Sequence, residues 1–259
     1  MGHDKIFDHM MLDGLEDAYE AGRSMGTFGE DCAAKYGFTR AEQDAFATAS
    51  VERAKAATAS GAFAAEITPV TVKSRAGETV VSVDAGPGKV QPDKIASLKP
   101  AFKKDGTITA ASSSSINDGA AALVMMRAST ATKLGCKPLA RIVGHATHAQ
   151  EPEWFATAPL GATQKALAKA GWAVGDVDLW EINEAFAVVP MALMKELNLP
   201  HDKVNVNGGA CALGHPIGAS GARIMVTLIH ALKARGLTKG LATLCIGGGE
   251  ATAMALELV

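Results

Sequence analysis

Two glycine-rich segments near the C-terminus each surround one reactive side chain. Residues 205–223 contain His215, and residues 244–250 contain Cys245. Glycine lets backbone amides approach a ligand closely, so each segment can present N–H groups beside its imidazole or thiol. Together they look like two thirds of a cysteine–histidine–cysteine active site. The sequence has no Cys-Gly-Ser-Gly-like turn that would supply the attacking thiol.

His215 lies just before a helical pattern over residues 220–234. The first turn of a helix has unpaired N–H donors and partial positive charge, so a histidine there is placed to act on a thiolate or a carbonyl oxyanion. Cys245 follows a strand-like run, where a thiol can serve as an acid or a base. The alternatives are a surface histidine in a glycine-rich turn and a cysteine that is only a small buried hydrophobic residue.

Asn183 and Glu184 end another strand-like run. The Asn183 amide can donate to a water or a carbonyl oxygen, and Glu184 can orient a neighbour, although either residue could simply cap a helix. A zinc site needs more ligands than Cys211 and His215, and no further ligand pair has the spacing for one. The sequence therefore predicts acid–base chemistry and no metal.

Composition limits the class of protein. The chain has 259 residues, 48% apolar and 20% charged, with a formal charge of −2; this indicates a soluble protein without the bulk basic excess of a nucleic-acid binder. Asp4, Lys5 and Asp8 interrupt any export signal, and no apolar run is long enough to cross a membrane. Four scattered cysteines without a CxxC pair predict reduced thiols and a cytoplasmic location.

Local signals predict a mixed first part of the chain. Ser24 or Thr27 is expected to cap a helix, and Thr39 with Glu42 forms a capping box that opens an alanine-rich helix ending near Gly61. The residues of that helix at helical spacing are Phe46, Ala49 and Ala56. Two strands around a turn are predicted next, at 67–72 and 79–83 around 74–77.

After residue 126, predicted strands alternate with helices. The strands are 140–145, 177–182, 242–246 and 252–258, and the helices are 161–170, 186–197 and 220–234. This alternation predicts a layered α/β domain. The apolar run 120–126 is short enough to be either a buried strand or a buried helix.

The helix predicted at residues 220–234 is apolar on nearly every side. Its large apolar residues are Ile224, Met225, Val226, Leu228, Ile229 and Leu232. A helix without a polar face should be buried on several sides. We therefore expect it between two sheets, one of them outside these residues.

Three motifs occur in a fixed order: Asn183-Glu-Ala-Phe-Ala, Gly-His215-Pro-Ile-Gly-Ala-Ser-Gly and Cys245-Ile-Gly-Gly-Gly. In this order they resemble the thiolases, in the acetyl-CoA acetyltransferase branch, and the resemblance runs through nearly the entire chain. Residues 24–31 and 114–120 are similar to the coenzyme A-contacting segments of that family. The resemblance implies that Ser114 and the region around Met25 line the pantetheine channel.

The resemblance also implies catalytic roles. His215 would activate a nucleophilic cysteine and, with a water held by Asn183, bind the thioester oxygen. Cys245 would take and return the proton at the α-carbon of the second acyl-CoA, and the Gly247 amide would contribute to a second oxyanion site. Such a Claisen condensation requires a covalent acyl carrier and a base, and it needs no metal or resident cofactor when amides and polarised water stabilise the oxyanions.

The fold implied by the resemblance is a thiolase-like layered α/β/α architecture with an inserted α+β loop domain, incomplete at the N-terminus. Residues 1–113 would be the loop domain, which covers coenzyme A and helps to assemble oligomers. Residues 114–128 would be the last strand of the N-terminal domain, and residues 129–259 the C-terminal domain. The part of the family that carries the nucleophile would lie outside these residues.

Two departures from the family shape the expected function. Ser24 stands where the family often has histidine, and the segment that carries the nucleophile in the family is missing from these residues. Cys32, Cys136 and Cys211 do not stand in the motif of that nucleophile. We therefore expect an acyltransferase of lipid metabolism, an acetyl-CoA acetyltransferase acting on acyl-CoA and coenzyme A, which is inactive as this chain alone.

The expected partners are further copies of the chain or an N-terminal thiolase segment supplied in trans. The alternative is a non-catalytic coenzyme A-binding or assembly subunit derived from a thiolase. A ketoacyl synthase-like enzyme is disfavoured, because those enzymes use a second histidine where Cys245 stands.

Overall fold

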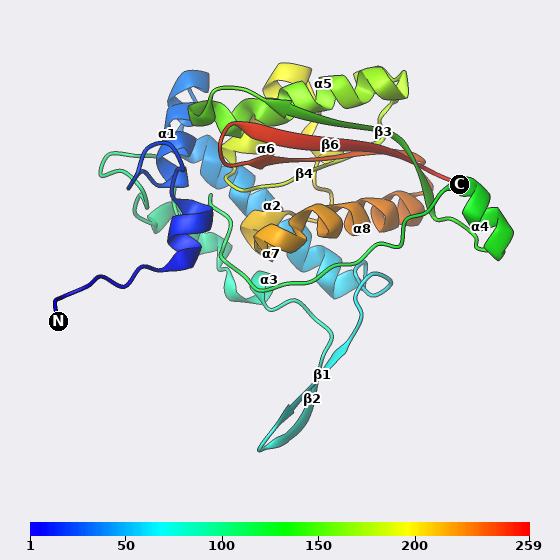
Figure 1. Ribbon diagram of the computed structural model, residues 1–259, viewed down its shortest axis with the longest axis horizontal. Helices are drawn as coiled ribbons and strands as arrows, with labels where there is room; N and C mark the ends of the chain where they lie inside the picture. The colour runs from blue at the N-terminus through cyan, green and yellow to red at the C-terminus, as the bar shows by residue number, and fades with distance from the viewer.

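A computed structural model describes all 259 residues and places one mixed β-sheet at the centre (Figure 1). The sheet has the strand order β3-β6-β5-β4, in which β4 and β5 are parallel and the other pairs are antiparallel. The strands are β3 (Ala140–Ala149), β4 (Leu179–Ile182), β5 (Lys239–Ile246) and β6 (Glu250–Leu258). An isolated parallel bridge between Trp180 and Val204 extends the sheet beyond β4.

Helices cover both faces of this sheet. Helix α5 (Ala158–Ala170) packs on one face and α8 (Ile217–Arg235) on the other, as Figure 1 shows. Helix α6 (Val188–Leu197) lies beside α5. All four residues of β4 are buried, because a strand covered on both faces has no solvent side. The layered α/β architecture predicted from the alternation of elements is confirmed.

Helix α8 is buried on several sides, as its apolar composition predicts. Among its six large apolar residues, only Val226 is half-buried and the others are buried. The sheet covers one side of the helix. Gly236, with a φ of 64°, ends the helix in the left-handed conformation that glycine adopts without strain.

Two further helices organise the first part of the chain, α1 (Met25–Tyr36) and α2 (Arg40–Ser60). The predicted capping box at Thr39 and the C-terminal cap at Gly61 are both present. Ser24 occupies the N-cap position of α1, but its side chain makes no capping hydrogen bond, and the Thr27 hydroxyl instead donates to the Ser24 carbonyl. The predicted cap position is therefore confirmed and the predicted side-chain cap is wrong.

The buried face of α2 differs from the predicted one. Phe46 is buried as expected, whereas Ala49 is only half-buried and Ala56 is exposed. The residues that pack inward are Gln43, Phe46, Ala47, Ser50, Val51, Ala54 and Ala57. A stretch rich in alanine carries little hydrophobic contrast, so its spacing does not specify which face turns inward.

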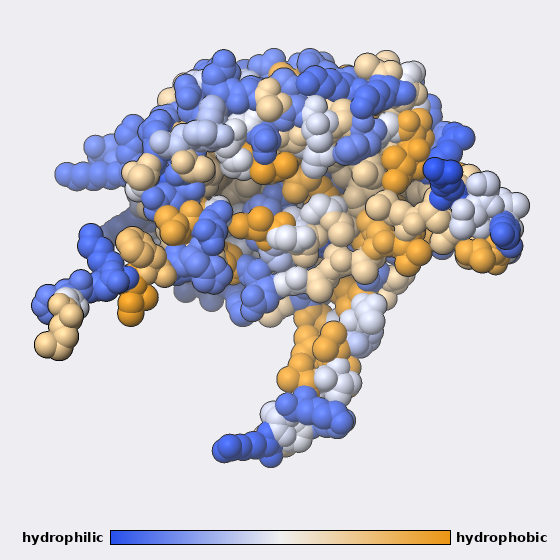
Figure 2. Space-filling view, viewed as in Figure 1, coloured by the Kyte–Doolittle hydropathy of each residue, from blue (hydrophilic) through white to orange (hydrophobic).

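A β-hairpin projects from the body of the molecule (Figure 1). It consists of β1 (Val70–Ser74) and β2 (Gly77–Val81), close to the predicted strands, and it pairs Val70 with Val81. Every residue of both strands is exposed. Figure 2 shows hydrophobic residues along the base of the hairpin and hydrophilic ones at its tip.

The apolar run 120–126 is neither a buried strand nor a buried helix, so both predicted alternatives are wrong for this structure. Residues 114–127 have no regular secondary structure, and Val124 is 89% exposed. None of the six strands pairs with this run, and an extended segment without a partner strand cannot form a sheet. Only Leu123 packs, half-buried, against the apolar cluster around α8.

The remaining elements are short. They are η1 (Met11–Leu15), α3 (Gly86–Lys89), η2 (Pro92–Ser97), α4 (Ala128–Leu134), η3 (Pro152–Thr157), η4 (Val174–Asp176), η5 (His201–Lys203) and α7 (Ala210–Leu213). No helix of the structure has both the length and the apolar composition needed to span a membrane.

Candidate active site

The His215 side chain is held at the start of α8. Its Nδ1 lies 2.5 Å from the Ser220 hydroxyl, which itself donates to the Pro216 carbonyl at 3.0 Å. Because the single hydroxyl proton is used on Pro216, the Ser220 oxygen accepts a hydrogen bond from Nδ1–H. The other ring nitrogen, Nε2, therefore carries the lone pair that a general base needs.

Asn183 makes a second contact to the same ring. Its Nδ2 lies 3.3 Å from His215 Nε2, and an amide N–H can donate to that lone pair. This agrees with the tautomer that Ser220 imposes. Asn183 is buried at the end of β4, and its Oδ1 is a buried acceptor without a hydrogen-bond partner. An open amide acceptor beside the imidazole can bind a water or a ligand donor.

The surroundings keep the imidazole neutral. Burial lowers the pKa of His215, repulsion of the proton by the Arg223 guanidinium contributes a smaller part, and together they bring that pKa to about 4. At neutral pH the ring is therefore uncharged, with Nε2 ready to accept a proton.

Glu184 positions the backbone of the histidine segment. Its buried carboxylate accepts from the Ser50 hydroxyl at 2.7 Å, from Asn205 Nδ2 at 2.8 Å and from the Cys211 backbone N–H at 2.9 Å. The Cys211 amide belongs to the first turn of α7, so Glu184 also satisfies a free donor of that helix. A carboxylate this fully bonded is a structural anchor of the turn that precedes His215.

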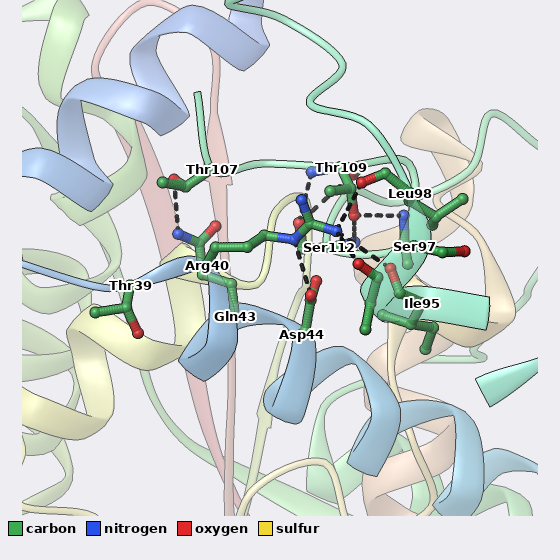
Figure 3. Close-up of polar contacts among 12 residues, drawn as sticks. Thr39, Arg40, Gln43, Asp44, Ile95, Ser97, Leu98, Thr107, Thr109 and Ser112 are labelled. Carbon is green, nitrogen blue, oxygen red and sulfur yellow. Dashed lines mark hydrogen bonds and ion pairs between the residues drawn. The ribbon is translucent and has the colours of Figure 1, made fainter. Parts of the chain in front are cut away.

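Residues 112–115 connect the two loops that carry Asn183 and His215. The Ser112 carbonyl accepts from the Ala187 amide at 2.8 Å, and the Ser115 carbonyl accepts from the His215 amide at 3.0 Å. Between them, the Ser114 amide and hydroxyl both donate to the Ala185 carbonyl at 3.0 Å. Figure 3 shows the preceding turn, in which the Ser112 hydroxyl accepts from the Thr109 amide.

Cys245 lies at the end of β5 in a different, apolar environment. Its neighbours form one buried cluster with it, including Phe28, Cys32, Ile108, Phe155 and Phe186. Burial raises the pKa of the Cys245 thiol to about 12, so the thiol is protonated at neutral pH. No hydrogen bond joins it to the His215 ring, whose two nitrogens contact Asn183 and Ser220.

The three glycines after Cys245 form a tight turn between β5 and β6. Gly248 and Gly249 both have a φ of 89°, which side chains rarely adopt, and a Cβ on Gly249 would lie 2.2 Å from the Gln150 carbonyl oxygen. The Met25 sulfur lies 3.4 Å from the position of a Cβ on Gly247. Met25 and Gly247, predicted separately from the sequence, thus lie side by side.

The other cysteines are not placed as partners of His215. Cys32 and Cys211 are buried, and burial raises the pKa of Cys32 to about 12 and that of Cys211 well above its ordinary value. Cys136 is exposed and lies in the chain just after the end of α4. No cluster of three or more potential metal-binding side chains exists in the structure.

A cleft of about 500 Å³ adjoins the histidine segment. Ser115, whose carbonyl accepts from the His215 amide, contributes to its lining, as do Lys89, Lys94 and Leu98 from the first part of the chain. Its volume lies in the range of small-molecule sites. Its two lysines provide positive charge for an anionic ligand.

Sequence reasoning missed Ser220 and the bridging role of residues 112–115. Ser220 could have been found, because it is the first residue of the helix predicted at 220–234 and lies only five residues after the histidine. The bridging hydrogen bonds use backbone atoms, which leave no signal in residue type.

Comparisons with known families match the two halves of the chain. The family model for the thiolase N-terminal domain matches residues 1–129, and that for the thiolase C-terminal domain matches residues 136–258. An acetyl-CoA acetyltransferase of Chromobacterium violaceum is 54% identical over 260 residues, covering 99% of this chain and 66% of that protein. A probable acetyl-CoA acetyltransferase of Dictyostelium discoideum is 51% identical, covering 99% of this chain and 62% of that protein.

Solved structures give the same assignment of fold. The crystal structure of the Bacillus anthracis acetyl-CoA acetyltransferase matches all of this chain with a TM-score of 0.95 at 45% identity, and the match covers 66% of that protein. The predicted thiolase-like fold is confirmed by this match. The chain spans 62% to 66% of the length of these relatives.

Proposed function

Because this chain belongs to the thiolase family, we propose that it carries the acid–base part of an acetyl-CoA acetyltransferase active site. The observation that supports this most directly is the neutral His215 ring, fixed by Ser220 with its Nε2 lone pair toward Asn183. A fixed, uncharged imidazole is the form that removes a proton from a thiol.

In the proposed thiolysis, His215 takes the proton of a nucleophilic cysteine, and the thiolate attacks the β-carbonyl carbon of a 3-ketoacyl-CoA. The bond between that carbon and the α-carbon then breaks, which leaves an acyl-enzyme and the carbanion of acetyl-CoA. Cys245 gives its proton to this carbanion. Cys245, now a thiolate, takes the proton of the coenzyme A thiol, and the coenzyme A thiolate attacks the acyl-enzyme. The nucleophilic cysteine leaves as a thiolate and takes its proton back from His215, which releases the shortened acyl-CoA.

The protonated state of Cys245 suits this direction. Its raised pKa of about 12 makes it a poor acid toward water but a sufficient one toward a carbanion, which is far more basic. In the condensation direction the same thiol must first become a thiolate. The apolar cluster around it excludes water that would otherwise compete for the proton.

The two oxyanions of the reaction need donors. We assign one to His215 together with a water on the Asn183 amide, and the other to the Gly247 amide in the glycine turn. Preorganised donors of this kind stabilise developing charge without a metal. The Asn183 Oδ1 is buried and has no hydrogen-bond partner, which supports a bound water at that place.

We propose that coenzyme A binds with its phosphate-bearing part in the cleft that contains Lys89 and Lys94. Its pantetheine arm would pass Ser114 and Met25 toward the two reactive side chains. The cleft supports this because its lining at Ser115 is bonded to the backbone of His215. Lysine side chains attract phosphate groups as point charges.

We also propose that the nucleophile is not one of the four cysteines in these residues, since none is hydrogen-bonded to His215. The 259 residues alone would then bind coenzyme A without turnover.

We also propose that the chain associates with further copies of itself. The exposed valines on the projecting hairpin support this, and sedimentation velocity over a range of concentrations would detect it.

The test is to mix this chain with a polypeptide that carries the N-terminal part of the Chromobacterium relative and to follow thiolysis of acetoacetyl-CoA. We expect activity in the mixture and about 100-fold slower turnover with His215→Gln or Cys245→Ser. Cys136→Ser, which changes an exposed thiol, is the matched control and should leave the rate unchanged.

A well-folded mixture without thiolysis would count against the proposed enzyme. If calorimetry then detected coenzyme A binding to the chain, the alternative of a non-catalytic coenzyme A-binding subunit would be favoured. Full activity of the His215 and Cys245 variants would refute the assigned roles.

A further inference from the structure

Arg40, the first residue of α2, holds the backbone of a neighbouring turn at residues 95–98. Its Nη2 donates to the carbonyl oxygens of Ile95, Ala96 and Leu98 at 3.2, 3.4 and 2.8 Å. Its Nε donates to the Asp44 carboxylate at 2.8 Å, one helical turn along α2. Figure 3 shows the guanidinium reaching from the helix to this turn.

The clamped turn depends on α2 for its position. Residues 92–97 form only a short 3₁₀ helix, and the turn is paired with no strand. Lys55, also on α2, donates to the Val90 carbonyl at 2.6 Å, and the buried Ile95 side chain packs with Ala47 of α2. Two cationic side chains and one apolar contact therefore attach this segment to the helix.

The same segment forms one wall of the 500 Å³ cleft. Its contributions to the lining are Lys89, Val90, Gln91, Lys94, Ile95 and Leu98. Leu98 carries one of the carbonyls that Arg40 holds, and Lys94 directly precedes the first of them, Ile95. The positions of a cation and of an apolar contact in the wall therefore depend on the clamp. Arg40 does not itself line the cleft.

We propose that Arg40 is a positioning residue for coenzyme A: by fixing the turn at residues 95–98, it sets the affinity of the cleft for the phosphate-bearing part of the ligand and leaves the chemical step unchanged. This inference rests on the proposed function, which places coenzyme A in this cleft. Arg40 would thus influence how tightly the cleft binds coenzyme A although its side chain does not line the cleft.

The clamp needs an arginine. A planar guanidinium can donate to Asp44 through one nitrogen while another nitrogen faces several carbonyls, whereas the ammonium of lysine is a single point with no fixed plane. Arg40→Lys should therefore keep only part of the hold on the turn at residues 95–98, and Arg40→Met should lose it. Asp44→Asn keeps the donors of Arg40 but weakens the anchor that orients them.

Calorimetric titration of the full chain with coenzyme A tests the inference. We expect Arg40→Met to weaken binding on the order of tenfold, as for the loss of hydrogen bonds to a charged group, with Arg40→Lys and Asp44→Asn between it and the unaltered protein. Arg141→Met is the matched control, since Arg141 pairs with Glu257 on the sheet at the surface, and it should bind normally. In the reconstituted thiolysis assay, KM for coenzyme A should rise while kcat stays the same.

The outcomes separate the two proposals. If the unaltered chain binds coenzyme A and Arg40→Met binds it within twofold, or if kcat falls and KM does not, the positioning role is overturned and the proposed function stands. If the unaltered chain does not bind coenzyme A, the assignment of the cleft fails and the positioning role fails with it. Should Arg40→Met fail to fold, Asp44→Asn decides, because normal binding by that variant overturns the inference.

Discussion

The neutral state of His215 predicts a specific dependence of stability on pH. Burial lowers the pKa of its ring in the folded protein from the ordinary 6.5 to about 4. Between these two values the unfolded chain binds a proton that the folded protein does not, so the free energy of unfolding falls as the pH falls. Above pH 7 the effect is absent, because the ring is neutral in both states.

The size of the effect follows from the shift. One pKa unit corresponds to about 1.4 kcal/mol, so His215 should cost about 2 kcal/mol of stability at pH 5 and about 3 kcal/mol at pH 4, relative to pH 7.5. His215→Gln removes the titrating group. The stability of the variant should therefore fall less steeply with acid, by about 2 kcal/mol between pH 7.5 and pH 5.

Urea unfolding followed by circular dichroism at several pH values measures this difference. Every other titrating group is present in both proteins and cancels in the comparison. His3→Gln, which replaces an exposed histidine, is the control and should follow the unaltered protein. If the stabilities of the unaltered protein and His215→Gln stay a constant distance apart from pH 7.5 to pH 5, the buried neutral imidazole described above is refuted.

Three further experiments test other parts of the structure. Gly249→Ala should destabilise the fold by roughly 3 kcal/mol in urea unfolding, because its φ of 89° and the nearby Gln150 carbonyl leave no place for a Cβ; a change below about 1 kcal/mol would contradict the turn. With iodoacetamide at pH 8, the exposed Cys136 should react first and Cys245 only after unfolding, which peptide mass spectrometry would detect; equal labelling would contradict its burial. Burial raises the pKa of Glu181 to about 8, so between pH 5 and pH 8 the folded protein holds a proton on this carboxyl that the unfolded chain releases. The free energy of unfolding should therefore fall from pH 5 to pH 8 more in the unaltered protein than in Glu181→Gln. Parallel stability curves for the two proteins would argue against a protonated carboxyl.

Elements with local signals were predictable from the sequence. The capping box at Thr39 and the glycine at position 61 are read within a few residues, and both bound α2 as predicted. The alternation of apolar runs likewise predicted the central sheet and its helices, since period and length are local properties. The orientation of α2 was not predictable, because the alanine residues on its faces differ little in hydrophobicity.

The arrangement of the site depends on contacts between distant parts of the chain. The motifs indicated His215 and Asn183, but the bond between Ser50 and Glu184 joins residues 134 positions apart, and no local pattern encodes it. The prediction for the run 120–126 was wrong for a related reason. Its apolar composition is compatible with a strand, but a strand also requires a neighbour, and the sequence does not state which segment lies alongside.

The hydrogen bonds of residues 112–115 have a consequence for how this site tolerates change. They are made mainly by backbone atoms, and Ser112 and Ser115 each accept a hydrogen bond from a different loop of the candidate site. Side chains here can therefore be exchanged while the spacing between the loops survives. Insertion or deletion of one residue between Thr109 and Ser115 would instead move one carbonyl off its partner. The distance between the two loops is thus encoded in the length of this segment rather than in its composition.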